Sequence, residues 1–158
     1  PLARPVTWVG DNITNNWDTT TANFTSLLGP TAFANGDAVT INDSGSNSPF
    51  LKVVGALAPD SLTINNTSKN FTLQGSGSLA ATGSFSKSGG GLLTISNTGP
   101  NSFTAATLEG GTLSLTTANA LGSAPITFTA GTLALSADQS NALVIDGTVS
   151  PASGCTAP

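Results

Sequence analysis

Two aspartates and their asparagine neighbours form the first group of residues that could bind a metal ion. Asp37 and Asp43 are six positions apart, and Asn42 and Asn47 lie close to them in the sequence. Calcium prefers carboxylate and amide oxygens as ligands, so a calcium loop over residues 42–45 is one interpretation. The spacing matches no calcium template, however, and Asn-Asp-Ser-Gly is typical of an Asx turn. We therefore predict a turn there, with no metal ion and no cofactor.

The two tryptophans, Trp8 and Trp17, form a second group, because indole faces can stack on the apolar faces of sugar rings. Asn12, Asn15 and Asn16 lie between them and could hydrogen-bond to sugar hydroxyls. The alternative is that both indoles fill one end of the hydrophobic core. We favour this core interpretation, since bulky aromatic side chains suit the terminal unit that a repeat fold needs.

The residue types that most enzymes use near neutral pH are missing from this chain. It has no His and no Tyr, and its single cysteine is Cys155. Serine triads, cysteine–histidine dyads and most zinc sites need residues that are absent here. The sequence thus predicts a protein without catalytic activity. Because Cys155 has no partner within the chain, it is either a free thiol or a link between subunits.

Charge and composition exclude one class of partner and favour one location. The net charge is −4, and the four cations, Arg4, Lys52, Lys69 and Lys87, are scattered along the sequence. Nucleic-acid binding needs a clustered basic surface, so we exclude it. Only 8% of residues are charged, and Ser, Thr, Asn and Gly take their place, which indicates a neutral, hydroxyl-rich surface. No apolar run reaches the roughly 20 residues of a membrane span. We expect a secreted protein, extracellular or at the cell surface.

A repeat of about 20 residues organises much of the sequence. Similar segments begin at residues 70, 90, 110 and 130, and their apolar positions alternate with small polar ones, which is typical of half-buried strands. Glycine and asparagine separate the strands, as sharp corners require. The segments place four leucines in one register and predict a single core ladder: Leu73, Leu93, Leu113 and Leu133.

A fixed period with short strands predicts a β-solenoid, in which each coil stacks on its neighbours. A β-sandwich is the alternative fold, but it has no reason to keep a strict register. We divide the chain into residues 1–55, an N-terminal arm and capping region; residues 56–149, the regular coils; and residues 150–158, a C-terminal tail. The capping region holds both tryptophans together with Phe24, Phe33 and Phe50.

Several segments resemble the autotransporter-associated β-strand repeat proteins, also called passenger-associated transport repeats. The resemblance covers about residues 7–135, and its most specific part runs from Lys87 to Ser96 and on to Gly111-Thr112-Leu113. Other matching segments are Thr7-Trp8-Val9-Gly10, Asn16-Trp17-Asp18, residues 33–45 and residues 71–77. The resemblance implies a large secreted bacterial protein with a right-handed parallel β-helix.

Two functions are compatible with these observations. In the first, the chain is a secreted structural rod that self-assembles end to end into a filament, or forms an adhesin stalk. Its partners are then further copies of itself, with Leu2, Pro5, Val6 and Cys155 as candidate subunit contacts. The alternative is a carbohydrate-binding or adhesin module of a larger secreted protein, which binds an extracellular polysaccharide through the tryptophans.

Overall fold

The computed structural model describes residues 2–48 and 50–146, and this part of the chain consists of short β-strands without a helix. The strands are β1 (Pro5–Trp8), β2 (Asn16–Trp17), β3 (Phe24–Ser26), β4 (Gly29–Thr31), β5 (Ala38–Asn42), β6 (Leu51–Val53), β7 (Ala56–Leu57), β8 (Ser61–Asn65), β9 (Phe71–Gln74), β10 (Ser78–Leu79), β11 (Phe85–Ser88), β12 (Leu92–Ile95), β13 (Ala106–Leu108), β14 (Thr112–Leu115), β15 (Ile126–Phe128), β16 (Thr132–Leu135) and β17 (Leu143–Ile145).

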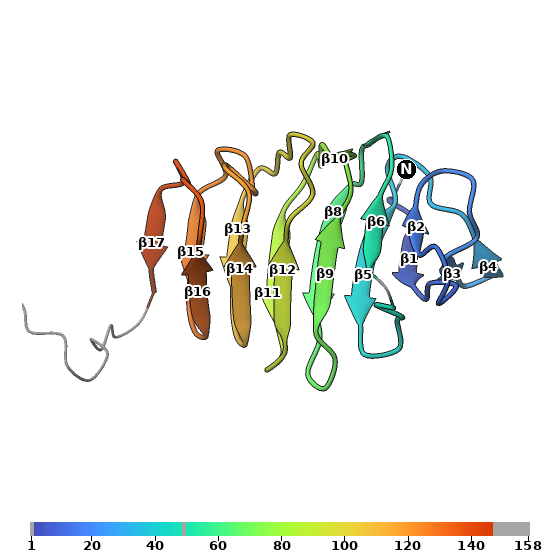
Figure 1. Cartoon of the computed structure of the whole chain (residues 1–158), viewed down its shortest axis with the longest axis horizontal. Coiled ribbons are helices and arrows are strands. Elements are labelled where there is room, and N and C mark those ends of the chain that lie inside the picture. The colour runs from blue at the N-terminus through green and yellow to red at the C-terminus, as the bar shows by residue number, and fades with distance from the viewer. Residues whose placement is uncertain (1, 49, 147–158) are drawn as a thin grey trace, which may run out of the picture.

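The strands stack into two long sheets that run the length of a rod (Figure 1). The first sheet has the order β17-β15-β13-β11-β8-β5-β1-β3-β4, and the second has the order β16-β14-β12-β9-β6-β2. Strands β7 and β10 form a short third sheet. Neighbouring coils pair in parallel, and each regular coil contributes one strand to each of the two long sheets. The predicted β-solenoid is therefore confirmed, and the β-sandwich is not the fold.

Alternation along each strand divides the residues between the core and the surface. In β5, for example, Val39 and Ile41 are buried, whereas Ala38, Thr40 and Asn42 are only half-buried. Val39 pairs with Leu62, and Leu62 pairs with Phe85, so equivalent inward side chains stack along the rod. Each coil thereby covers the apolar residues of the coil before it, and the core is continuous.

The predicted leucine ladder is correct for three of its four members. Leu93, Leu113 and Leu133 are paired in succession at intervals of 20 positions. Leu73 belongs to the neighbouring ladder, because it pairs with Ile95, 22 positions later, while Phe71 pairs with Leu93. The earlier coils are longer than the later ones, and a strict 20-residue count therefore assigns Leu73 to the wrong ladder.

An aromatic cluster fills the N-terminal end of the core. Trp8, Trp17, Phe24 and Phe33 are each at most 1% exposed, and Phe24 packs edge-on against both indoles with ring centroids 5.2 and 5.6 Å apart. Strands β3 and β4 form an antiparallel hairpin that covers the outer edge of β1. This arrangement agrees with the predicted aromatic cap. Phe50 is 39% exposed and lies outside the cluster.

Glycine at one corner allows consecutive coils to approach closely. Gly111 has a φ of 68°, which L residues with side chains rarely adopt. A Cβ atom there would meet the carbonyl oxygens of Gly89 and Gly91 and the ammonium group of Lys87. Gly90 offers a contrast in the neighbouring coil, because a Cβ atom there would meet no atom within 4 Å.

We expect Gly111→Ala to destabilise the fold by about 2 kcal/mol or more, because it adds a strained backbone to a steric clash. Gly90→Ala is the matched control and should change the free energy of unfolding by less than about 0.5 kcal/mol. Urea denaturation followed by circular dichroism measures both. Equal effects of the two substitutions would show that the close corner contact is not a stability determinant.

Candidate functional site

Neither tryptophan is placed to bind sugar. Both side chains are 0% exposed, and the Trp8 indole N–H donates to the carbonyl oxygen of Ser46 at 2.6 Å. Asn15 is also buried, and its side-chain oxygen accepts from the backbone N–H groups of Asp11 and Asn12. The sugar-stacking interpretation of Trp8 and Trp17 is therefore wrong, because both indoles are needed in the cap.

The aspartates that could have bound calcium accept hydrogen bonds from other groups of the protein. The side chain of Asn42 accepts from the backbone N–H of Ser44, as an Asx turn requires. Asp43 reaches the next coil and accepts from the backbone N–H groups of Thr67, Ser68 and Lys69. These bonds, those from Ser68 and Thr67 first, lower the pKa of Asp43 from 3.8 to about 2.

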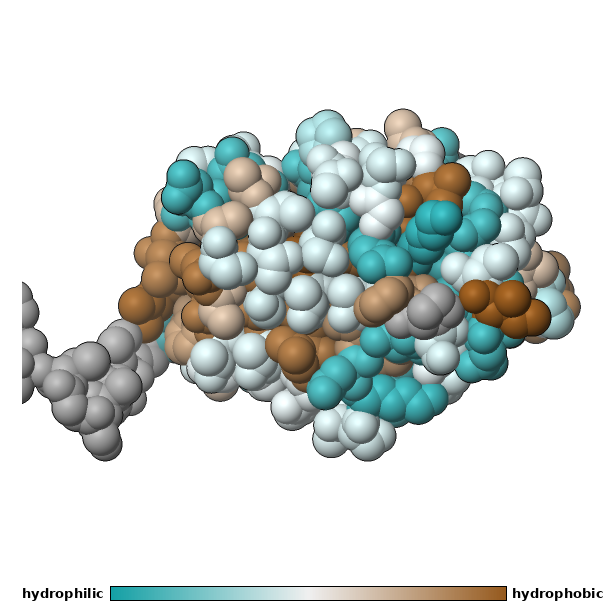
Figure 2. Space-filling view, in the orientation of Figure 1, coloured by the Kyte–Doolittle hydropathy of each residue, from teal (hydrophilic) through white to brown (hydrophobic). Residues whose placement is uncertain are grey.

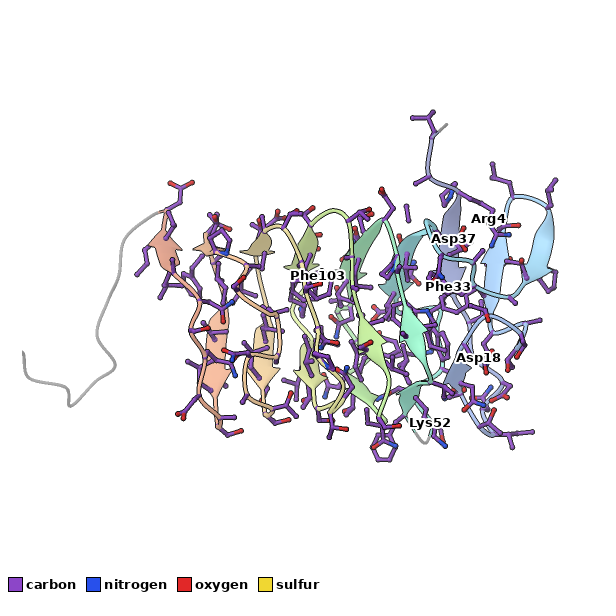
Figure 3. All side chains as sticks on the ribbon, turned by 90° about the horizontal axis from the view of Figure 1, so that it is seen from above. Arg4, Asp18, Phe33, Asp37, Lys52 and Phe103 are labelled. Atoms are coloured by element: carbon purple, nitrogen blue, oxygen red, sulfur yellow. The ribbon has the colours of Figure 1, made fainter. Side chains whose placement is uncertain are left out.

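Asp37 makes an ion pair with Arg4 at 2.7 Å at the N-terminal end of the rod (Figure 3). It also accepts from the backbone N–H of Ala34. Within residues 2–48 and 50–146, no three His, Cys, Asp or Glu side chains gather in a way that could hold a metal ion. Asp37 and Asp43 thus connect segments that are far apart in the sequence.

The depressed pKa of Asp43 makes stability depend on pH in the acid range. Its contribution is fully present above pH 3.8 and is lost as pH falls toward about 2, because the folded state must then take up a proton. We expect Asp43→Asn to lower stability at pH 7 and to weaken this acid-range loss. Asp138→Asn, at an exposed side chain, is the control, and thermal unfolding between pH 2 and 7 checks both.

The candidate subunit contacts near the N-terminus have different environments. Leu2 is 100% exposed and Pro5 is exposed, so both are accessible for contact. Val6 is only 2% exposed because it points into the core from β1, and its prediction as a contact residue is wrong. Cys155 lies outside the described residues.

The hairpin turn between β3 and β4 exposes apolar residues that sequence reasoning missed. Leu27 is 94% exposed and Leu28 is 99% exposed, and they border a hollow of about 270 Å³ with Arg4 and Pro5. The hairpin lies at one extreme of the rod (Figure 1). The Leu-Leu pair between Ser26 and Gly29 was a visible signal, because turn positions rarely hold two large apolar residues.

The opposite end of the described rod leaves its core uncovered. Leu135 and Leu143 face inward but are 55% and 51% exposed, whereas their partners one coil earlier, Leu115 and Ile126, are 0% and 3% exposed. Ile145 repeats this pattern at 45%. Figure 2 shows apolar residues gathered at this end of a largely neutral surface. Both ends of the rod are therefore apolar.

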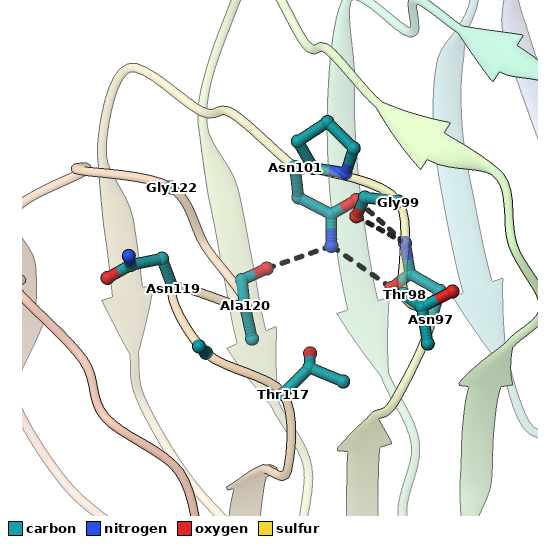
Figure 4. Close-up of a pocket in the computed structure, with 10 residues that line it drawn as sticks. Asn97, Thr98, Gly99, Asn101, Thr117, Asn119, Ala120 and Gly122 are labelled. Carbon is teal, nitrogen blue, oxygen red and sulfur yellow. Dashed lines mark hydrogen bonds between the residues drawn. The ribbon is translucent and has the colours of Figure 1, made fainter.

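A polar hollow of about 300 Å³ lies at the corners that follow β12 and β14 (Figure 4). Asn97 and Asn101 line it, and their amides donate to each other at 2.8 and 3.0 Å. Asn101 also donates to the carbonyl oxygen of Ala120 and accepts from the backbone N–H of Leu79. These amides are already bonded to the protein, so the hollow is a stacked corner rather than a binding site.

Lys87 is a buried cation without an acidic partner among the described residues. It is 0% exposed and faces inward from β11, where its neighbours in the ladder are Ile64 and Leu108. Its ammonium group donates to the carbonyl oxygens of Ser88, Gly89 and Gly110. Burial lowers the pKa of Lys87. The alternation Phe85-Ser86-Lys87 could have revealed this inward position.

Because the pKa of Lys87 is lower in the folded state, the unfolded chain binds that proton more tightly. The free energy of unfolding should therefore rise as pH increases through the alkaline range toward 10.5. In Lys87→Met this rise should disappear, whereas the exposed control Lys52→Met should retain it. Urea unfolding at several alkaline pH values tests this, and an unchanged rise in Lys87→Met would contradict it.

No protein family, curated protein or solved structure matches this chain. The resemblance to the autotransporter-associated repeats therefore stays a prediction. Among the described residues, there is no helix of sufficient length and hydropathy to cross a membrane.

Proposed function

We propose that this chain is a secreted bacterial structural protein, a β-solenoid rod that assembles end to end into an extracellular filament or adhesin stalk. The supporting observation is that its large exposed apolar side chains include groups at both ends of the rod, at Leu27 and Leu28 and at Leu135, Leu143 and Ile145. Association of these ends would remove apolar surface from water, which is the main driving force for assembly.

Strand edges add a second reason for assembly at the open end. Strands β16 and β17 are the last strands of their sheets, and each has one edge without a partner among the described residues. Such edges readily pair with another chain. The opposite edge of the first sheet is β4, which carries Pro30 and so lacks one N–H donor. Contact at that end would then depend more on the side chains of Leu27 and Leu28.

Secretion and a bacterial source are supported by the low charge, the hydroxyl-rich composition and the family resemblance. An adhesive role is compatible with the same rod. The alternative of sugar binding through tryptophan is not supported, because both indoles are buried. We propose no enzymatic activity, since the sequence lacks histidine and its carboxylates are few and scattered.

The assembly model predicts that a charge at the open end blocks association. We expect the double variant Leu143→Asp/Ile145→Asp to weaken self-association by about tenfold or more, because assembly would bury unpaired carboxylates. Thr94→Asp, on an outward position of β12, is the control. Light scattering after size exclusion and negative-stain electron microscopy measure the size and shape of the particles.

The parent protein and Thr94→Asp should form elongated particles whose mass rises with concentration, whereas the double variant should stay monomeric with an unchanged circular dichroism spectrum. A parent protein that is monomeric at every concentration would refute end-to-end assembly. Assembly that persists in the double variant would refute the role of the open end.

A further inference from the structure

A ladder of hydroxyl groups runs along the outer face of the first sheet. One outward position of each of seven successive strands, β3, β1, β5, β8, β11, β13 and β15, holds threonine or serine. The register pairs them in this order: Thr25, Thr7, Thr40, Thr63, Ser86, Thr107 and Thr127. Six of the seven are threonine, although the strands come from distant parts of the sequence.

These hydroxyls are not needed for the fold's own hydrogen bonds. Within the described part of the chain, none of the seven side chains donates to or accepts from a protein group. Hydroxyls at the strand ends behave differently, since Thr129 and Thr116 donate to the carbonyl oxygens of Leu108 and Ile95 in the coil before them. The ladder is thus a line of free donors and acceptors, each with a methyl group beside it except at Ser86.

The backbone fixes the spacing of the ladder. Neighbouring strands in a sheet are about 4.8 Å apart, so seven strands carry the hydroxyls over about 29 Å. The side chains are half-buried or exposed, and β-branched threonine has restricted χ1 rotamers. A shallow hollow of about 240 Å³ borders Thr7, Thr25 and Thr40 at the N-terminal end. The part of the ladder from Thr63 to Thr127 lies outside this hollow.

The chemistry of this face limits what it can bind. The ladder has no charged or aromatic side chain, so it offers neither ion pairing nor ring stacking. A neutral hydroxyl that exchanges water for another hydroxyl gains only about 0.5–1.5 kcal/mol, which gives a dissolved sugar little affinity. Binding of water requires no such exchange of hydrogen-bond partners, because water already hydrates the face. A repeated array can arrange that water into an ordered layer.

We propose that the threonine ladder of the first sheet binds ice. The hydroxyls would hold water molecules at the strand spacing, and the methyl groups would order the water between them, so that this layer joins the surface of an ice crystal. Each contact is weak, but the rigid ladder forms all of them together without ordering flexible side chains. This inference is independent of the proposed end-to-end assembly, because it uses a face of the single rod.

The test measures thermal hysteresis, the gap between melting and freezing of a single ice crystal, together with inhibition of ice recrystallisation. The protein used is the Leu143→Asp/Ile145→Asp variant alongside the parent, so that assembly and ice binding are measured separately. We expect both proteins to show thermal hysteresis and to inhibit ice recrystallisation. Absence of both effects at millimolar concentration would overturn the proposal.

Substitutions then locate the face. Thr63→Lys should remove most of the hysteresis, because a long charged side chain rises from the middle of the ladder, whereas Thr63→Val should retain a substantial part of it. Thr94→Lys places the same side chain on the second sheet and should leave hysteresis unchanged. Equal losses in Thr63→Lys and Thr94→Lys would overturn the assignment.

A crystalline polysaccharide is the competing solid with ordered hydroxyl groups. Pull-down on cellulose and chitin particles with the same three variants distinguishes it from ice. Retention that depends on Thr63 without any hysteresis would show that the face binds a glycan, and the ice proposal would be wrong. Circular dichroism of each variant confirms that the β-solenoid is intact.

Discussion

Parallel, in-register stacking of coils is the constraint on which the rest of this structure depends. An inward residue is covered when the next coil places another inward side chain directly over it, as Leu62 does for Val39 and Phe85 does for Leu62. The same pairing fixes the backbone hydrogen bonds of both long sheets. Because each coil depends on its neighbour, the first and last coils of the described residues each lack a neighbour on one side.

The two ends of the rod meet this constraint differently. At the N-terminal end, four aromatic side chains replace a missing coil, and the hairpin of β3 and β4 covers the edge of β1. At the other end of the described residues, Leu135 and Leu143 remain half-exposed. An apolar layer above them would complete their burial, as it does for Leu115 and Ile126. The end-to-end model supplies that layer from a second copy.

Much of the fold could be predicted from the sequence, because its period and its alternation are local signals. The coils and the corners follow from them, and the aromatic cap was expected because a repeat fold needs a terminal unit. The register of Leu73 could not be predicted, since the earlier coils are longer and only the pairing of Leu73 with Ile95 reveals this. The exposure of the tryptophans could not be predicted either, because composition alone does not say whether an indole is buried in the core or exposed on the surface. Val6 looked like part of a free arm until its strand pairing placed it inside.

In-register stacking also explains why the surface is so poor in charge. Equivalent outward positions lie about 4.8 Å apart, so a repeated charge would form a line of repelling groups. Neutral hydroxyls avoid this repulsion, and their abundance alone is therefore no argument for a ligand.

Which neutral residue occupies each outward position says more about ligand binding than the number of hydroxyls does. On the second sheet, one outward row contains Leu92 with Thr112 and Thr132, and another contains Ala134 with Thr94 and Ser114. The first sheet instead keeps a hydroxyl on seven successive strands, which stacking alone does not require.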